Sequence, residues 1–148
     1  MKLAAGACCL ALAAASCGPS GDPVEALLEA LEAAVEEKDA DAVAARLSPD
    51  FQTASGQSRE DATQTLKRLL LGYETVEVER IASEVERGEG SAVVRCWVGF
   101  SGRARPVGGL AGLLPPDATY RFDVDAVESE AGWRVSRLGW ERVETRVE

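Results

Sequence analysis

The spacing of apolar residues changes at about residue 73, and this change constrains the fold more than any other feature of the chain. Before it, leucine, valine and alanine recur at the spacing of one helix face. After it, apolar and polar residues alternate, as in strands with one buried face. Helices followed by long strands predict an α+β fold, in which the helices cover one face of an antiparallel sheet.

The first helix is predicted to begin after Asp22, which can cap it, with Pro23 in its first turn. Its apolar residues follow helical spacing, and we expect them to form one buried stripe: Val24, Leu27, Leu28, Leu31 and Val35. Four acidic residues occupy the other faces of this helix and are predicted to be solvated: Glu25, Glu29, Glu32 and Glu36.

Two more helices are expected before residue 73. A short one should follow Asp39 or Asp41, and the segment Ser48–Asp50 should end it, because a proline disfavours a helical residue before it. A third helix should begin after Ser58, which can cap it, and stop at Gly72, since glycine is common just beyond a helix.

Four long strands are predicted after residue 73, and a short strand or turn before the third helix. The expected ranges are 75–86, 92–100, 120–126 and 133–143, with 51–54 for the short segment. A change of parity between Val78 and Ile81 predicts a bulge in the first long strand. The alternation directs one set of side chains toward the helices: Val94, Cys96, Val98, Phe122 and Val124. Asp123 and Asp125 should therefore point outward.

The first sixteen residues differ from the rest of the chain. Lys2 is their only charged residue, and residues 3–15 form an apolar run shorter than the ~20 residues that a membrane-crossing helix needs. A positive start, a short apolar core and small residues before a cut site are typical of a secretory signal. We therefore expect a signal at 1–16, a tether at 17–23 and one domain at 24–148.

Cys17 stands at the expected cut site. Residues 12–17 read Leu-Ala-Ala-Ala-Ser-Cys and resemble the bacterial lipobox, in which small residues precede a cysteine that is acylated and becomes the new N-terminus. The resemblance implies an exported lipoprotein held at a membrane by lipid on Cys17. Gly18 and Pro19 follow in place of an acidic inner-membrane retention signal, which favours the outer membrane, with the domain facing the periplasm.

The acidic composition and the lack of histidine exclude several classes of function. A net charge of −9 argues against binding nucleic acid, which needs a basic surface. Without histidine the chain lacks the commonest general base and transition-metal ligand, and we expect neither a metal nor a cofactor. Among the four cysteines only Cys96 lies beyond residue 17, and its apolar neighbours predict a small buried hydrophobic residue.

Five short segments carry a family resemblance, and they are residues 36–43, 47–51, 56–61, 132–135 and 138–140. The last two read Gly-Trp-Arg-Val and Leu-Gly-Trp. Their order over residues 24–143 resembles the NTF2-like, or SnoaL-like, superfamily. The resemblance implies a cone, in which a bent antiparallel sheet of about four to six strands wraps the N-terminal helices.

The open end of such a cone is a pocket that superfamily members use for isomerisation, dehydration, cyclisation, ligand binding or dimerisation, so the fold alone does not determine function. We favour a non-catalytic module that binds a small apolar ligand or a protein partner. The segment 102–117 should contribute, because it is long for a hairpin loop and contains several leucines. Its candidate contact residues are Arg103, Arg105, Leu110, Leu113 and Leu114.

A cofactor-free isomerase or lyase is the first alternative. Family dehydratases rely on a histidine–aspartate pair, which this chain lacks, whereas ketosteroid-isomerase-like members use carboxylates and a tyrosine. The candidates for such a role are Asp50, Tyr73 and Tyr120. This role requires Asp50 to be buried and to face either tyrosine, and otherwise Asp50 stabilises a turn.

The second alternative is a structural module that forms a homodimer through its sheet face.

Overall fold

The computed structural model describes residues 21–105 and 117–144, in which the chain forms the predicted α+β fold. Its helices are α1 (Pro23–Glu36), α2 (Ala40–Ala44) and α3 (Arg59–Leu71). Its strands are β1 (Leu47–Thr53), β2 (Tyr73–Gly88), β3 (Ser91–Ala104), β4 (Asp117–Ser129) and β5 (Gly132–Val143). None of the helices in these two ranges is long and apolar enough to cross a membrane. The expected signal and Cys17 lie outside the described residues.

Each helix begins at a side chain that accepts hydrogen bonds from the first backbone N–H groups. The Asp22 carboxylate caps α1, as predicted, by accepting from the N–H two residues further on at 2.9 Å. Of the two candidate caps for α2, the structure selects Asp39, whose Oδ1 accepts from the Ala42 N–H at 2.9 Å. Ser58 caps α3 and Gly72 ends it, so both predicted ends of this helix are confirmed.

The strands form one sheet in the order β1-β5-β4-β3-β2. Strands β2 to β5 pair antiparallel with one another, but β1 runs parallel to β5, so the sheet is mixed where we predicted an antiparallel one. β1 also takes in Ser48–Asp50, which the sequence had assigned to a helix end. Leu47 is buried and pairs with Val135 of β5, and Pro49 favours an extended backbone at Ser48, so the chain enters a strand here.

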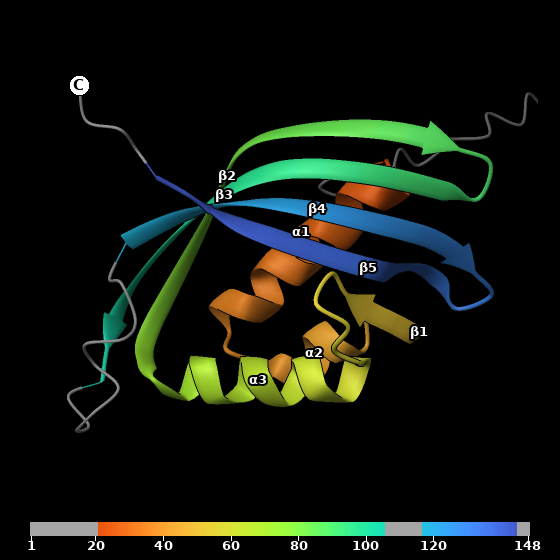
Figure 1. Cartoon of the computed structure of the whole chain (residues 1–148). Coiled ribbons are helices and arrows are strands. Elements are labelled where there is room, and N and C mark those ends of the chain that lie inside the picture. The colour runs from red at the N-terminus through yellow and green to blue at the C-terminus, as the bar shows by residue number, and fades with distance from the viewer. Residues whose placement is uncertain (1–20, 106–116, 145–148) are drawn as a thin grey trace, which may run out of the picture.

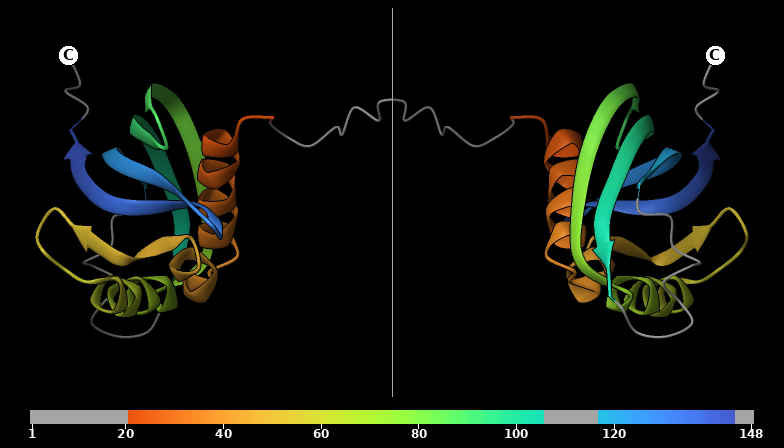
Figure 2. Two further views of the ribbon diagram at one scale, coloured as in Figure 1. Left: turned by 90° about the vertical axis from the view of Figure 1, so that its right-hand side faces the viewer. Right: turned by 90° about the vertical axis from the view of Figure 1, so that its left-hand side faces the viewer.

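The four long strands bend around α1, which lies along the concave face of the sheet (Figures 1 and 2). The pairing of β2 with β3 shifts register between Arg80 and Ala82, which confirms the predicted bulge. Val78 before the bulge and Val85 after it both pack against the core, because the extra residue restores the inward direction of the side chains.

The hydrophobic core fills the space between α1 and this concave face. Four of the five residues that the alternation directed inward are fully buried, namely Val94, Cys96, Val98 and Val124, and Phe122 is partly buried against them. The helix contributes Val24, Leu27, Leu28 and Ala34, while Leu31 packs against the core with part of its surface open.

Candidate functional site

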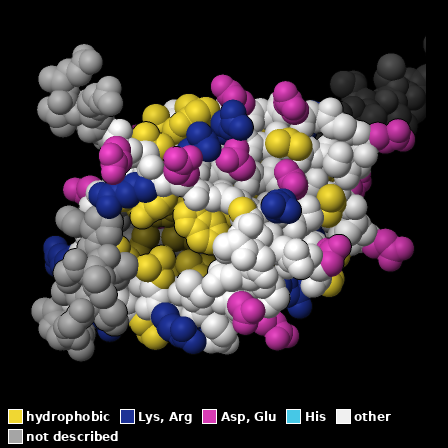
Figure 3. All heavy atoms as spheres, viewed as in Figure 1, with side chains coloured by type: hydrophobic (Ala, Val, Ile, Leu, Met, Phe, Trp, Pro, Cys, Tyr) yellow, Lys and Arg dark blue, Asp and Glu magenta, His cyan; other side chains and the backbone are white. Residues whose placement is uncertain are grey.

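A cavity of about 390 Å³ lies between α1, α3 and the concave face of the sheet. Figure 3 shows a hollow on this face of the molecule whose visible walls are hydrophobic side chains. Leu28 and Leu31 of α1, Ala62 and Leu66 of α3 and Val98 of β3 are among the residues that line the cavity. Its volume falls in the range of about 300–1,000 Å³ that is usual for small-molecule sites.

Three aromatic rings form one wall of this cavity. Phe100 meets Tyr120 edge-on with ring centroids 5.9 Å apart, and it meets Phe122 edge-on at 6.0 Å. Leu69 and Trp140 also line the cavity but are 43% and 48% exposed, so they stand where it opens to solvent. Aromatic and branched aliphatic walls of this kind present a large contact area to apolar groups.

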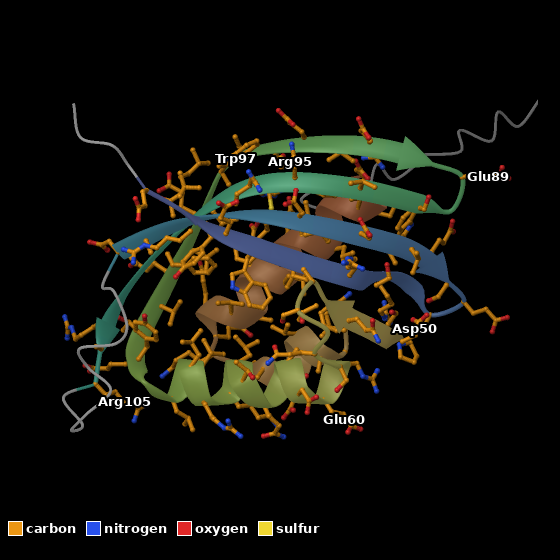
Figure 4. The ribbon with its side chains drawn as sticks, viewed as in Figure 1. Asp50, Glu60, Glu89, Arg95, Trp97 and Arg105 are labelled. Carbon is orange, nitrogen blue, oxygen red and sulfur yellow. The ribbon has the colours of Figure 1, made fainter. Side chains whose placement is uncertain are left out.

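The structure brings together two of the three candidate catalytic residues and leaves the third apart. Tyr73 and Tyr120 both line the cavity, and burial, together with the neighbouring Tyr120, raises the pKa of Tyr73. Asp50 is exposed on β1, where it accepts a hydrogen bond from the Ser48 hydroxyl at 2.8 Å (Figure 4). It is not among the lining residues, so the arrangement of Asp50 facing a tyrosine is not formed.

A half-buried ionic cluster joins α1 to β2 beside the cavity, and no sequence pattern predicts it. The Nε of Arg80 lies 2.8 Å from Oε1 of Glu32. The Nη1 of Arg80 lies 2.9 Å from Oε2 of Glu25, and its Nη2 donates to the other oxygen of Glu25. The side chains of Glu25 and Glu32 are only 30% and 26% exposed, so our prediction that both are solvated is wrong.

The position of the cluster perturbs the ionisation of its members. Burial raises the pKa of Glu32, and Arg80 opposes part of that effect. The hydrogen bonds to Glu25 raise the pKa of Arg80. Burial also raises the pKa of the nearby Cys96 thiol to about 11, which confirms that Cys96 is a buried thiol, and it is neutral at ordinary pH.

Glu32 stands out among the cavity residues by its charge. Among the described residues that line the cavity, it is the only one with a charged side chain. Arg80 is 14% exposed and is absent from the lining, so it lies behind the carboxylate. The wall therefore presents a negative group to whatever enters the cavity, in surroundings where water screens charge poorly.

Of the five predicted contact residues in segment 102–117, the structure describes two. Arg103 is exposed, 3.9 Å from the Glu74 carboxylate, and Arg105 donates from Nε to the Tyr73 carbonyl at 3.2 Å. Neither arginine lines the cavity, and Figure 4 places Arg105 at the opposite side of the domain from Asp50. The remaining three predicted contacts, Leu110, Leu113 and Leu114, fall in the range that the structure does not describe. A role for this segment stays a prediction.

The outer face of the sheet mixes charged and apolar side chains. Arg95 and Trp97 project from β3 on this face (Figure 4). Asp123 lies 2.9 Å from Arg95 and 3.6 Å from Arg121, so its predicted outward direction is confirmed. Val93, on the same face, is 50% exposed. Within the two described ranges, no group of three or more potential metal ligands is arranged to hold an ion. A homodimer through this face stays a prediction.

No family model matches the sequence, and no curated protein matches it either. Solved structures do match. A protein from Novosphingobium aromaticivorans, provisionally assigned as a scytalone dehydratase, superposes with a TM-score of 0.70 and 15% identity, covering 85% of this chain and 86% of that one. An NTF2-like superfamily protein from Salmonella enterica serovar Typhimurium gives a TM-score of 0.69 at 12% identity, covering 84% and 91%.

A provisionally assigned dehydratase of the NTF2-like family from Streptomyces avermitilis also matches, with a TM-score of 0.68, 12% identity and coverage of 83% and 95%. These similarities establish that this chain has an NTF2-like fold, as its sequence predicts. At such low identities they do not carry an activity over to this chain, so its function has to be argued from the site.

Proposed function

We propose that this NTF2-like domain binds a small, mainly apolar molecule in its concave cavity. The observation that carries the proposal is the cavity itself, with a volume of about 390 Å³ and walls of leucine, valine and aromatic side chains. Each methylene group that moves from water into such surroundings contributes about 0.8 kcal/mol. Transfer of a small hydrocarbon ligand from water into the cavity would therefore supply enough free energy for binding, with no need for a chemical step.

We further propose that the domain is held at the outer membrane, facing the periplasm, by lipid on Cys17. The support is the lipobox-like sequence of residues 12–17 and the short apolar run before it. Replacing Cys17 with serine removes the thiol to which the acyl chain would be attached. We expect the variant to lose metabolic labelling by a palmitate analogue in the native bacterium, while unsubstituted protein is labelled. Equal labelling of the two would refute the anchor.

Filling the cavity should weaken binding of an apolar probe. Ala62 of α3 is partly buried and lines the cavity, so a phenylalanine at this position would project into empty space. We expect Ala62→Phe to reduce the affinity for pyrene by about tenfold or more, since a filled pocket loses most of the apolar contact. Pyrene fluorescence, which reports the polarity around the probe, measures the affinity in the full chain carrying Cys17→Ser.

Ala33→Phe is the matched control, because Ala33 is exposed on α1 and outside the cavity lining. It adds the same ring to a helix surface and should leave pyrene affinity unchanged. Thermal unfolding of both variants checks that each still folds. If pyrene binds Ala62→Phe as tightly as it binds the unsubstituted cavity, or binds neither, the proposed site is wrong.

A cofactor-free isomerase or lyase is the second candidate, and one observation favours it. Glu32 is a cavity carboxylate whose pKa burial raises, which is the direction that suits a general base near neutral pH. Tyr73 and Tyr120 line the same cavity and could donate hydrogen bonds to a carbonyl oxygen. The test is exchange of deuterium from solvent into the carbon beside the carbonyl of an apolar cyclic ketone. If the unsubstituted protein catalyses this exchange and Glu32→Gln abolishes it, the result would favour the enzymatic function.

A further inference from the structure

We propose that the ligand of this cavity carries a hydrogen-bond donor, either an amine or a hydroxyl group, that binds Glu32, and that anionic apolar molecules such as fatty acids are rejected. The inference rests on the proposed binding function and specifies the chemical class of the ligand. It follows from the position of one carboxylate among lining residues that, in the part of the chain that the structure describes, are otherwise uncharged.

The first step concerns which member of the ionic cluster a ligand meets. Glu32 lines the cavity, whereas Arg80 and Glu25 are absent from its lining. Each nitrogen of the Arg80 guanidinium already faces a carboxylate oxygen of these two glutamates, which takes three of its five N–H donors. Because Arg80 is also absent from the lining, an anionic ligand in the cavity meets Glu32 first.

The second step concerns the acceptor capacity of Glu32. Among the described residues, the structure gives this carboxylate one ion-pair partner, Arg80, on Oε1. A carboxylate has about four lone-pair positions, so Glu32 can accept at least one more hydrogen bond. A donor group on an entering ligand can supply that bond, and a ligand carboxylate cannot.

The third step is the balance of charge. Two carboxylates share one guanidinium, so the cluster carries a net negative charge when both are ionised. The other described lining residues are uncharged and include the aromatic wall of Phe100, Tyr120 and Phe122, so they offer no positive charge to offset that of the cluster. A cation or a neutral donor is stabilised in this field, whereas an anion is repelled.

Competition against pyrene by three molecules with the same alkyl chain tests the proposal. Decylamine, decanol and decanoate differ only in the head group, so their apolar contributions cancel. In the full chain carrying Cys17→Ser at neutral pH, we expect decylamine to bind about tenfold or more tighter than decanoate, the size of one charge-assisted hydrogen bond, with decanol between them.

Glu32→Gln should bring the three affinities close together. The amide keeps an oxygen that Arg80 can donate to, while the cluster becomes neutral. Glu37→Gln is the matched control, because it removes the same charge at the exposed C-cap of α1, outside the cavity lining, and should keep the full preference. Circular dichroism verifies that both variants fold.

A second measurement needs no variant. Lowering the pH protonates Glu32 while decylamine stays charged, so the preference of the unsubstituted cavity for decylamine over decanol should disappear in acid. The titratable and charged groups that act electrostatically on Glu32 are Arg80 of β2, Cys96 of β3, and Glu25, Glu29 and Glu36 of its own helix.

The outcomes separate the two proposals. If pyrene does not bind at all, the proposed binding function fails. If pyrene binds but decanoate competes as well as decylamine, or Glu32→Gln and low pH leave the preference intact, the cavity binds apolar molecules and the role of Glu32 is refuted. Tighter binding of decanoate would make Arg80 the recognising group and would overturn the inference.

Discussion

Replacing Arg80 with methionine is expected to destabilise the domain by about 3 kcal/mol. Methionine keeps the apolar bulk of the side chain but leaves Glu25 and Glu32 without their shared counter-charge. Removing one partner of a buried ion pair costs about 3–5 kcal/mol, and we take the lower end because both carboxylates retain about a quarter to a third of their exposure. Urea unfolding of the two proteins at neutral pH measures the difference.

Arg87→Met is the control for this substitution. Arg87 lies on the same strand and also pairs with a carboxylate at α1, that of Asp22, but these side chains are 48% and 34% exposed. An exposed pair of this kind contributes up to about 1 kcal/mol, so the control should be close to neutral. Equal losses for the two arginines would mean that the Arg80 cluster is more exposed to water than the structure places it.

The loss in Arg80→Met should shrink as the pH is lowered. Burial already raises the folded-state pKa of Glu32 above its ordinary value of 4.5, and removing Arg80 raises it further. With a folded pKa above the unfolded one, the native state binds more protons, so stability falls as pH rises through the interval between the two values. Below that interval Glu32 is protonated, and its contribution to the destabilisation is absent. A pH-independent loss would indicate a packing defect.

Much of the fold is determined by local signals that the sequence shows directly. Asp22 and Ser58 have the capping chemistry that starts a helix, and alternation around Val94 and Cys96 identifies the buried face of β3. The parallel pairing of β1 with β5 lacks such a signal, because it depends on a contact between segments far apart in the chain. The sequence predicts a helix end near Leu47, and tertiary pairing with Val135 makes this segment part of a strand instead.

The candidate site was predictable only in part, for a related reason. Tyr73 and Tyr120 were identified as candidates because of their chemistry, and the cavity contains both. Glu32 was missed because an acidic residue beside an apolar stripe normally faces water. Its spacing did contain a signal, since Glu32 follows Leu28 by one helical turn and shares its face. Arg80 likewise lies two residues after Val78, so strand alternation directs both side chains to the same face. The bulge that follows Arg80 breaks this alternation and hides the signal.

Replacing Leu27 with alanine is expected to cost about 3–5 kcal/mol, the upper part of the range for buried leucines. Leu27 is 3% exposed in the core and is not part of the cavity lining, so the lost methyl groups leave a new void in close-packed surroundings. Leu71→Ala is the surface control, because Leu71 is 70% exposed and its truncation should cost less than about 0.5 kcal/mol. Urea unfolding, analysed with one shared m-value, compares the free energies of unfolding of the unsubstituted protein and the two variants.

Leu31, one turn further along α1, makes this experiment informative about the cavity as well as the core. It is only partly buried and lines the cavity, so some of its surface has no protein atoms against it. Truncating it loses fewer contacts and creates less new void, and we expect Leu31→Ala to cost about 2 kcal/mol or less. If Leu31→Ala costs as much as Leu27→Ala, protein atoms must pack against Leu31 on all sides. The space that we assign to a ligand would then be filled in solution.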